Sequence, residues 1–398
     1  MKSIGRCLTL STAVTGALLL TVGGVFAADT VKIGVVQPLS GPAALSGNNS
    51  LNGARLAADA INEAGGIRSL GGAKIELVTV DSPSSNTAGT ATQRLISQNK
   101  VAAVVGAYAS GITLAVSEVT ERAGVPLVTF SFADQITARG YKNIFQVSPK
   151  GSALGGAQFK YGLELLKNAG KSANRVAILY EDSAYGVSLA EGFRKAAAAA
   201  NATVVLDEGY PLGITDATPL VNKLRSANAD VVFPISTALN DSLQIIRSMR
   251  QQRMMTPVVG GSAGYVIPEF GEGLGQNAEG VLSIATANAD QAPEITATYK
   301  KKYGKFMAHE AMIHAAAVDA VAKALEAAKS TKPSDVRDAL AKTSTCDGFA
   351  KLVPGGCIKF DETGANTSAR PIMVQWRGNE LVTVYPEADA KAKVELGN

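Results

Sequence analysis

The sequence predicts an α/β protein made of two doubly wound lobes, each built on a parallel sheet. The first observation is an alternation of short apolar segments, typical of buried strands, with longer segments whose apolar residues recur at helical spacing. Such alternation implies right-handed βαβ crossovers and parallel strands. The second observation is length, because the 371 residues that follow a predicted 27-residue leader exceed the usual size of a single core.

The expected strands and helices follow one another along the whole chain. In the first half, strands are expected over residues 31–36, 74–80, 101–105, 125–129 and 141–147, with helices near 51–61, over 87–98 and from 112 onward. In the second half, strands are expected over 175–180, 203–206, 230–233, 257–259 and 278–285, with helices over 155–168 and 187–200 and around 220 and 243. One long helical stretch over 294–329 and a β-hairpin of 372–376 and 381–384 complete the chain.

No linker rich in Pro, Gly or Ser separates the two units. We therefore expect the lobes to be joined by three crossover segments, with the late helices returning to the first lobe. Lobe 1 is predicted to contain residues 29–149 and 280–345, and lobe 2 residues 150–279 and 346–398.

The N-terminus has the pattern of a secretory signal peptide. Lys2 and Arg6 precede an apolar segment over residues 8–22, and the small residues around Ala27 form a cleavage signal. The apolar segment is short for a membrane span and rich in Gly and Thr. We expect cleavage after about Ala27, removal of Cys7 with the leader, and export of the protein to the periplasm.

The cysteine number and the net charge indicate which kinds of site the sequence supports. Cys346 and Cys357 are an even pair at short separation, which predicts one disulfide in an oxidising compartment. No Cys or His cluster suggests a metal site, and no cofactor is expected. Loss of Lys2 and Arg6 lowers the net charge from +4 to +2, and no basic run indicates nucleic-acid binding.

A stretch of small and hydroxyl residues follows two neighbouring strands of the first lobe. Ser110 follows one strand and stands at the expected N-cap of the next helix, and Ser131 follows the other strand. In an open α/β sheet, ligands bind beyond the carboxyl ends of the strands, where a helix N-terminus offers free N–H groups to an anion. Ser110 could equally be only a helix cap.

Several motifs along the mature chain resemble one bacterial family. They are Val31-Lys-Ile-Gly-Val-Val-Gln-Pro-Leu-Ser-Gly-Pro42, the Asn52-Gly53…Ile61-Asn62…Gly65-Gly-Ile67 block, Thr137-Ala-Arg-Gly-Tyr141 and Asp182-Ser-Ala-Tyr-Gly186. Their order and spacing are similar to those of the leucine/isoleucine/valine-binding protein family, the periplasmic receptors of ABC importers for hydrophobic amino acids and related amides. The resemblance implies a type I periplasmic-binding-protein fold that closes like a Venus flytrap on a small solute. It also implies docking on ABC permease membrane subunits and no enzymatic activity, and we expect a monomer.

The resemblance also implies site residues. Ser110 matches the serine that binds the ligand carboxylate, and Tyr185 matches the tyrosine of the Tyr-Gly motif. Ser131 and Ala133 lie in the loop that holds carboxylate and ammonium in the family, and Ala133 replaces a threonine there. Ser46 replaces a family tyrosine, and Ser262 stands where the family has the acid that binds the ammonium.

These departures leave the ligand open. A buried ammonium without a carboxylate partner costs several kcal/mol. The ligand is therefore either a branched-chain or other hydrophobic amino acid, or an aromatic or branched carboxylate. Tyr108, Phe130 and Phe132 could line such a site or serve as core, and Ser236 is a weaker candidate contact.

Two other functions stay open. Gly260-Gly-Ser262-Ala-Gly264 fits a hydrolase nucleophile elbow with His309 and His314 downstream, although Pro268 interrupts the helix that should follow. We expect these histidines to be surface or packing residues. A sensor of the same fold that regulates a signalling partner is the other alternative.

Overall fold

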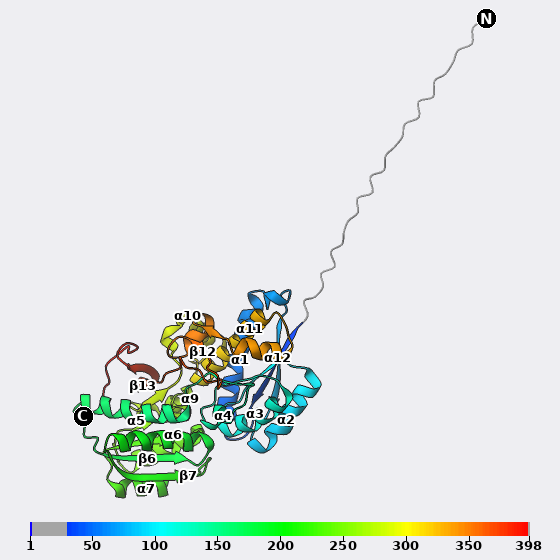
Figure 1. The fold of residues 1–398 in the computed structure, drawn as a ribbon. Coiled ribbons are helices and arrows are strands. Elements are labelled where there is room, and N and C mark those ends of the chain that lie inside the picture. The colour runs from blue at the N-terminus through cyan, green and yellow to red at the C-terminus, as the bar shows by residue number, and fades with distance from the viewer. Residues whose placement is uncertain (2–29, 397–398) are drawn as a thin grey trace.

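The computed structural model describes Met1 and residues 30–396, and the predicted signal peptide lies outside the described residues. Two α/β lobes lie side by side (Figure 1). One is built around helices α1 (Ala44–Glu63) to α4 (Gln135–Ala138), and the other around helices α5 (Gly151–Asn168) to α9 (Pro268–Leu274). The predicted fold class is confirmed.

The sheet of the first lobe has five parallel strands. Their order across the sheet is β2 (Ile75–Asp81), β1 (Val31–Gln37), β3 (Ala103–Gly106), β4 (Leu127–Thr129) and β5 (Ile144–Gln146). The order reverses between β1 and β3. This topological switch point is where the crevice of a doubly wound sheet opens.

The second lobe repeats this order. Its strands, joined by hydrogen-bonded pairs and a parallel bridge from Val232 to Val258, are β7 (Thr203–Tyr210), β6 (Arg175–Glu181), β8 (Val231–Ile235), β9 (Val259–Gly260), β10 (Leu282–Ala285), β13 (Ile372–Arg377) and β14 (Glu380–Tyr385). Its switch point lies between β6 and β8. The predicted hairpin β13–β14 is confirmed, and it adds an antiparallel edge to the otherwise parallel sheet.

Helices connect and flank these strands. In the first lobe they are α1 (Ala44–Glu63), α2 (Ser85–Asn99), α3 (Ser110–Ala123), α4 (Gln135–Ala138), α11 (His309–Ala328) and α12 (Pro333–Leu340). In the second lobe they are α5 (Gly151–Asn168), α6 (Ala184–Ala199), α7 (Thr218–Ala227), α8 (Leu239–Gln251) and α9 (Pro268–Leu274). Short 3₁₀ helices include η1 (Arg68–Leu70), η2 (Ala263–Tyr265), η3 (Gly275–Ala278), η4 (Ala289–Gln291) and η5 (Gly348–Leu352).

The prediction of one helical stretch over 294–329 is wrong. The structure has α10 (Pro293–Tyr303) and α11, separated by a loop that begins at Gly304. Gly304 takes the left-handed conformation, with φ of 77°, that ends helices and that other residues avoid.

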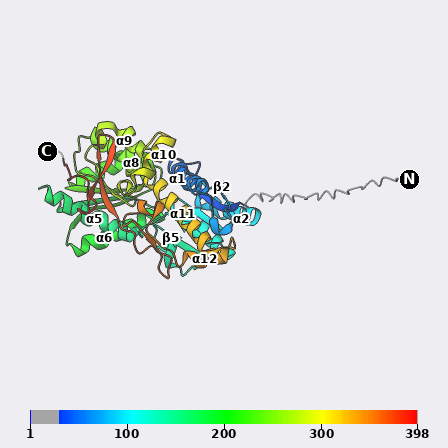
Figure 2. The same ribbon diagram turned by 90° about the horizontal axis from the view of Figure 1, so that it is seen from above.

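Helix α11 is the central helix of the first lobe. Most of its residues are buried, including both histidines, and it packs along α1 (Figure 2). Gly53 of α1 permits this close approach, because a Cβ atom there would lie 2.0 Å from the backbone oxygen of Ala311. The glycine of the Asn52-Gly53 motif is therefore explained by the close packing of α1 on α11. The expectation that His309 and His314 are surface or packing residues is correct only for packing.

The lobe boundaries stay a prediction, and two sets of contacts bear on them. β10 pairs with β9 and β13, so it belongs to the second sheet although the predicted boundary assigns residues from 280 to lobe 1. The segment 346–365 is predicted in lobe 2, yet η5 packs on α11 and Ala365 bridges Gln146 of β5. These contacts favour a second crossing after β10 and a third before β13.

The predicted disulfide between Cys346 and Cys357 is present. It joins the segments that carry the short strands β11 (Ser344–Thr345) and β12 (Ile358–Lys359), and η5 lies in the loop that it closes. The disulfide thus closes a loop whose helix η5 packs on α11.

Replacing both cysteines, Cys346→Ser with Cys357→Ser, should lower the free energy of unfolding by about 3 kcal/mol, because the disulfide closes a short loop in the unfolded chain. Urea unfolding of the two proteins, both prepared without reductant, measures the difference. Equal midpoints would contradict a stabilising role for the disulfide.

Candidate functional site

The candidate site lies where the switch points of the two sheets face each other. Loops after β3 and β4 supply one side, and loops after β6, β8 and β9 supply the other. The backbone N–H of Tyr108, just beyond β3, donates to Oε1 of the buried Gln37 at the end of β1, at 2.9 Å. This bond links the two strands at the switch point and positions the Tyr108 loop.

Ser110 organises the first side of the site, although not as the predicted N-cap. It is the first residue of α3, Ala109 is the cap, and no side chain caps this helix. The Ser110 hydroxyl instead accepts hydrogen bonds from the backbone N–H groups of Phe132 and Ala133, each at 3.2 Å. A hydroxyl, two backbone donors and a helix N-terminus therefore converge at one buried point, which is the chemistry of an anion site.

Aromatic rings surround this point. Tyr108 stacks on Phe130 with ring centroids 5.7 Å apart, and Phe130 contacts Phe132 edge to face at 4.6 Å. Phe132 in turn reaches Tyr185 of the second lobe, at 5.6 Å. The cavity that these rings line together with Ser110 has a volume of only about 10 Å³. That is about the minimum for one water molecule, so any larger ligand requires the lobes or the rings to move.

A hydrogen bond from Tyr108 also joins the two lobes here. The Tyr108 hydroxyl donates to the backbone oxygen of Thr237, just beyond β8, at 3.1 Å. The hydroxyl of Tyr185 donates to the backbone oxygen of Gly261 within the second lobe. The structure therefore shows the lobes closed on each other, with Tyr108 crossing between them.

Glu181 is a buried acid beside this site that the sequence analysis missed. It ends β6, and its carboxylate accepts hydrogen bonds from the Ser183 hydroxyl at 2.5 Å and from the backbone N–H of Thr237 at 2.6 Å. Burial nevertheless raises the pKa of Glu181 to about 7, against these hydrogen bonds that lower it. Burial is the main reason why the pKa of Tyr185 is raised, and the charge of Glu181 raises it further. Glu181 and Tyr185 therefore lie close enough to interact.

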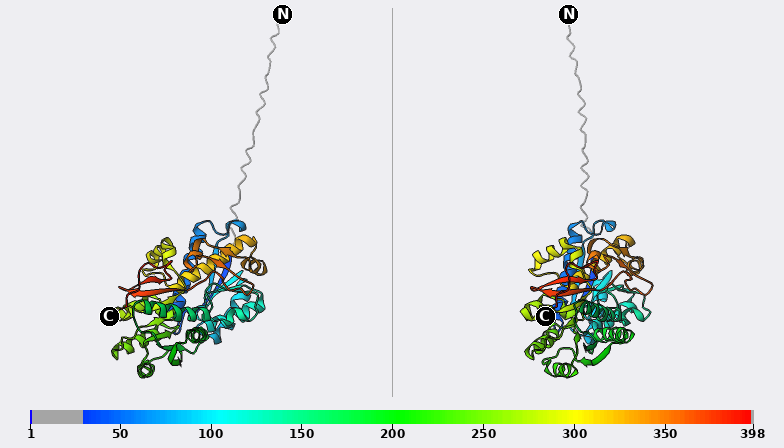
Figure 3. Two further views of the ribbon diagram at one scale, coloured as in Figure 1. Left: turned by 60° about the vertical axis from the view of Figure 1, so that its left-hand side comes forward. Right: turned by 90° about the vertical axis from the view of Figure 1, so that its left-hand side faces the viewer.

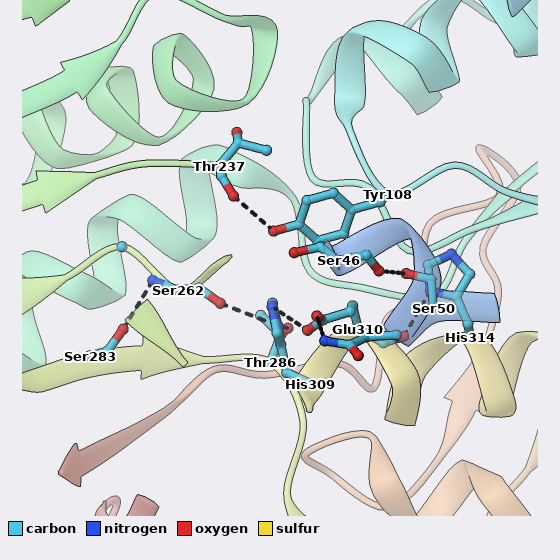
Figure 4. Close-up of polar contacts among 12 residues, drawn as sticks. Ser46, Ser50, Tyr108, Thr237, Ser262, Ser283, Thr286, His309, Glu310 and His314 are labelled. Atoms are coloured by element: carbon cyan, nitrogen blue, oxygen red, sulfur yellow. Dashed lines mark hydrogen bonds and ion pairs between the residues drawn. The ribbon is translucent and has the colours of Figure 1, made fainter. Parts of the chain in front are cut away.

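A second group of buried polar side chains, Ser262, His309 and Glu310, is drawn below Tyr108 in Figure 4. The Ser262 hydroxyl lies 3.5 Å from Nδ1 of His309, and Nε2 of His309 lies 3.3 Å from Oε2 of Glu310. Oε1 of Glu310 accepts from the side-chain amide of Asn49 on α1, at 3.1 Å. Ser46, one turn earlier on α1, lies beside both Glu310 and the Tyr108 hydroxyl.

The His309–Glu310 contact is a contact between neutral groups. Burial raises the pKa of Glu310 to about 8 and lowers the pKa of His309 to about 3. At neutral pH the carboxyl group therefore keeps its proton, and the imidazole is neutral with a proton on only one of its two nitrogens. The same burial lowers the pKa of His314 to about 4.

The structure brings Ser262 and His309 together, as a hydrolase would require, but three features oppose catalysis. The Ser262 side chain is fully buried, its oxygen is 3.5 Å from the imidazole, and an imidazole with a pKa of about 3 is a weak general base. His314 does not take part, because its Nδ1 faces the backbone oxygen of Glu310.

The other predicted contacts divide in two groups. Ala133 and Tyr185 lie with Ser110 at the site, and Ala133 contributes its backbone N–H. The hydroxyl of Ser131 points instead to the backbone oxygens of Ala107 and Tyr108, at 2.7 and 3.1 Å. Ser236 turns toward the hydroxyls of Tyr210 and Tyr265, at 2.6 and 3.2 Å. As ligand contacts, both remain predictions that this closed arrangement does not favour.

No helix among the described residues is long and apolar enough to span a membrane. Within the same residues, no group of three or more His, Cys, Asp or Glu side chains is placed to hold a metal ion.

The chain belongs to the periplasmic binding protein family, whose sequence model matches residues 30–380. The Leu/Ile/Val-binding protein homologs 8 and 7 of Brucella suis biovar 1 are 32% and 31% identical to it. The alignments cover 99% and 95% of this chain and 97% and 96% of those proteins. The predicted family is confirmed.

Solved structures agree with the fold. The branched-chain amino acid transporter substrate binding protein LivJ from Streptococcus pneumoniae, in complex with isoleucine, is 27% identical with a TM-score of 0.78. The match covers 89% of this chain and all of LivJ. A solute binding protein of an ABC transporter from R. palustris, in complex with benzoate, has the same TM-score at 19% identity, over 91% of this chain and all of that one, and shows the fold alone.

Replacing Glu310 by Gln should change how stability depends on pH. A raised pKa means that the folded protein keeps a proton between about pH 4.5 and 8 that the unfolded chain has lost, so stability falls as pH rises. Glu310→Gln has no titratable group at this position, so it lacks this decrease of stability with rising pH. Its free energy of unfolding should therefore rise relative to wild type by up to about 1.4 kcal/mol per pH unit between pH 5 and 8.

Urea unfolding at four pH values across this window measures the difference, and Glu191→Gln, a change at an exposed position of α6, is the control. A pH-independent difference between Glu310→Gln and wild type would show that Glu310 is already ionised in the folded protein.

Proposed function

We propose that this protein is the periplasmic receptor of an ABC importer and binds a small, hydrophobic carboxylate between its lobes. The convergence of the Ser110 hydroxyl with the N–H groups of Phe132 and Ala133 carries this proposal. In the same proposal the leader is cleaved near Ala27, the receptor acts without catalysis, and the closed lobes dock on the permease subunits.

The carboxylate would replace internal bonds at the site. In the closed structure the Ser110 oxygen is the acceptor for both backbone N–H groups. An entering carboxylate would accept from those two N–H groups and from the Ser110 hydroxyl, next to the positive end of α3. Charge-assisted bonds of this kind are about twice as strong as neutral ones, so the exchange favours an anion.

The aromatic wall would select the rest of the ligand. Apolar ring surface lies around the place where the carboxylate would bind, and it comes from Tyr108, Phe130, Phe132 and Tyr185. An apolar body packs against such rings, whereas a charged one would lose its hydration without a partner. The amino-acid class is also that of LivJ, which was crystallised with isoleucine.

Glu181 would decide between these two classes. It is buried, lies beside Tyr185 and has a pKa of about 7. A ligand ammonium nearby would favour the ionised form of Glu181. The Glu181 carboxylate would then be the counter-charge to the ammonium, in place of the family acid that Ser262 replaces here.

Ligand entry requires the lobes to open. The cavity of about 10 Å³ excludes an amino acid in the closed state, and the Tyr108 to Thr237 hydrogen bond must break to enlarge it. A ligand that contacts both sides then restores the closed state, which is the form that a permease would recognise.

A thermal-shift panel tests the carboxylate site. The mature protein, unfolded and refolded to strip any solute, should be stabilised by leucine, phenylalanine, 4-methylpentanoate or benzoate, by about 2.7 kcal/mol at a hundred times the dissociation constant. Ser110→Ala should weaken the active ligand about 10- to 100-fold, because it loses a hydrogen bond to a charged group. Ser117→Ala, a buried serine later on α3, is the matched control. The absence of any shift from the whole panel would contradict the proposal.

Glu181→Gln identifies the ligand class. If the ligand is an amino acid, this variant should lose at least tenfold in affinity for it and lose nothing for the acid without the amino group. Isothermal titration with both ligands measures the ratio. Equal losses for the two ligands would show that Glu181 only supports Thr237.

A further inference from the structure

A second cavity lies apart from the cleft, beneath the C-terminal hairpin, which the views of Figure 3 show in red. We call it the hairpin cavity. Its volume is about 280 Å³, and none of its lining residues lines the cleft cavity. Its walls come from β10 and the segment after it, from α10, from the start of α11 and from β13 and β14.

The interior of the hairpin cavity is apolar. One wall is a small hydrophobic cluster that contains Val266, Ala285 and Val374, with Leu381 packed against it. The lining also includes Met307 and Met312, both buried. Methionine side chains are flexible and polarisable, so they adapt to aromatic guests.

The charged groups of the hairpin cavity stand at its rim and are paired. The Thr383 hydroxyl donates to Oδ2 of Asp290 at 2.9 Å, and Nζ of Lys300 lies 3.9 Å from Oε1 of Glu380. Asp290, Lys300 and Glu380 are exposed. Because these charged groups are paired and lie at the rim, the apolar interior offers no counter-charge to an ionic ligand.

His309 is the buried titratable residue of the lining. Its Nδ1 lies 3.5 Å from the hydroxyls of Ser262 and Thr286, and its ring packs edge to face on Phe130 at 5.1 Å. Because burial keeps His309 uncharged at neutral pH, it adds a polar but neutral surface to the cavity. It also separates the hairpin cavity from the aromatic wall of the cleft.

We propose that the hairpin cavity is a second binding site, for a small uncharged aromatic molecule about the size of indole. An apolar cavity of about 150 Å³ stays dry and binds benzene, so 280 Å³ has room for two fused rings. An apolar wall with few polar groups is the usual composition of a small-molecule site. The inference does not depend on the carboxylate site, because the two cavities share no residue.

The test uses indole as the probe and the mature protein labelled with ¹³C at its methionine methyl groups. The methyl resonances of Met307 and Met312 should shift with saturable dependence on indole concentration, because ring currents act only within a few ångströms. Met249, which is buried in another core cluster, and Met373 should not shift. Shifts of Met249 alone, or none that saturate, would overturn the proposal.

Two variants of α10 separate the hairpin cavity from other sites. Ala297→Trp places a large side chain at the mouth and should weaken indole binding at least tenfold. Thr298→Trp, at the next exposed position and outside the lining, should bind as wild type does. Ser110→Ala should also leave indole binding unchanged. Unchanged binding in Ala297→Trp, or a loss in Ser110→Ala, would overturn the proposal and place indole elsewhere or in the cleft.

Discussion

The buried N–H groups of Phe132 and Ala133 are the constraint on which the site depends. They follow β4, have no strand partner and lie out of contact with water, and a buried donor without an acceptor is costly. The Ser110 hydroxyl satisfies both in the closed structure. In the proposed function, a carboxylate would accept from the same two N–H groups with a full charge.

The same region joins the lobes. Tyr108 continues the loop that begins at the first switch point, and its hydroxyl reaches Thr237 at the second. Thr237 is in turn held by Glu181 at the end of β6. Tyr108, Thr237 and Glu181 are therefore connected by hydrogen bonds. In the proposed function, a ligand that contacts one of them would change the contacts between the lobes.

Part of the site follows from sequence and part does not. Ser110 could be singled out because small and hydroxyl residues follow predicted strands, and parallel strands bring their carboxyl ends to one edge. Ala133 and Tyr185 were implied only by the resemblance to a known family. Glu181 and Glu310 could not be identified as site residues, because an acid at the end of a strand or in a helix is normally exposed. One signal for Glu181 was available, namely its place directly before the Asp182-Ser-Ala-Tyr-Gly186 motif.

By itself, the sequence determined the fold class, the order of strands and helices, the family and the disulfide, since these depend on local periodicity, motif spacing and cysteine number. The tertiary structure alone decided which side chains face each other. It paired the Ser131 hydroxyl with backbone oxygens and the Ser236 hydroxyl with Tyr210, made α11 a central helix and split the late helical stretch at Gly304. It also placed His309 between Ser262 and Glu310. Burial and long-range packing set these features, and neither is encoded in any short stretch of sequence.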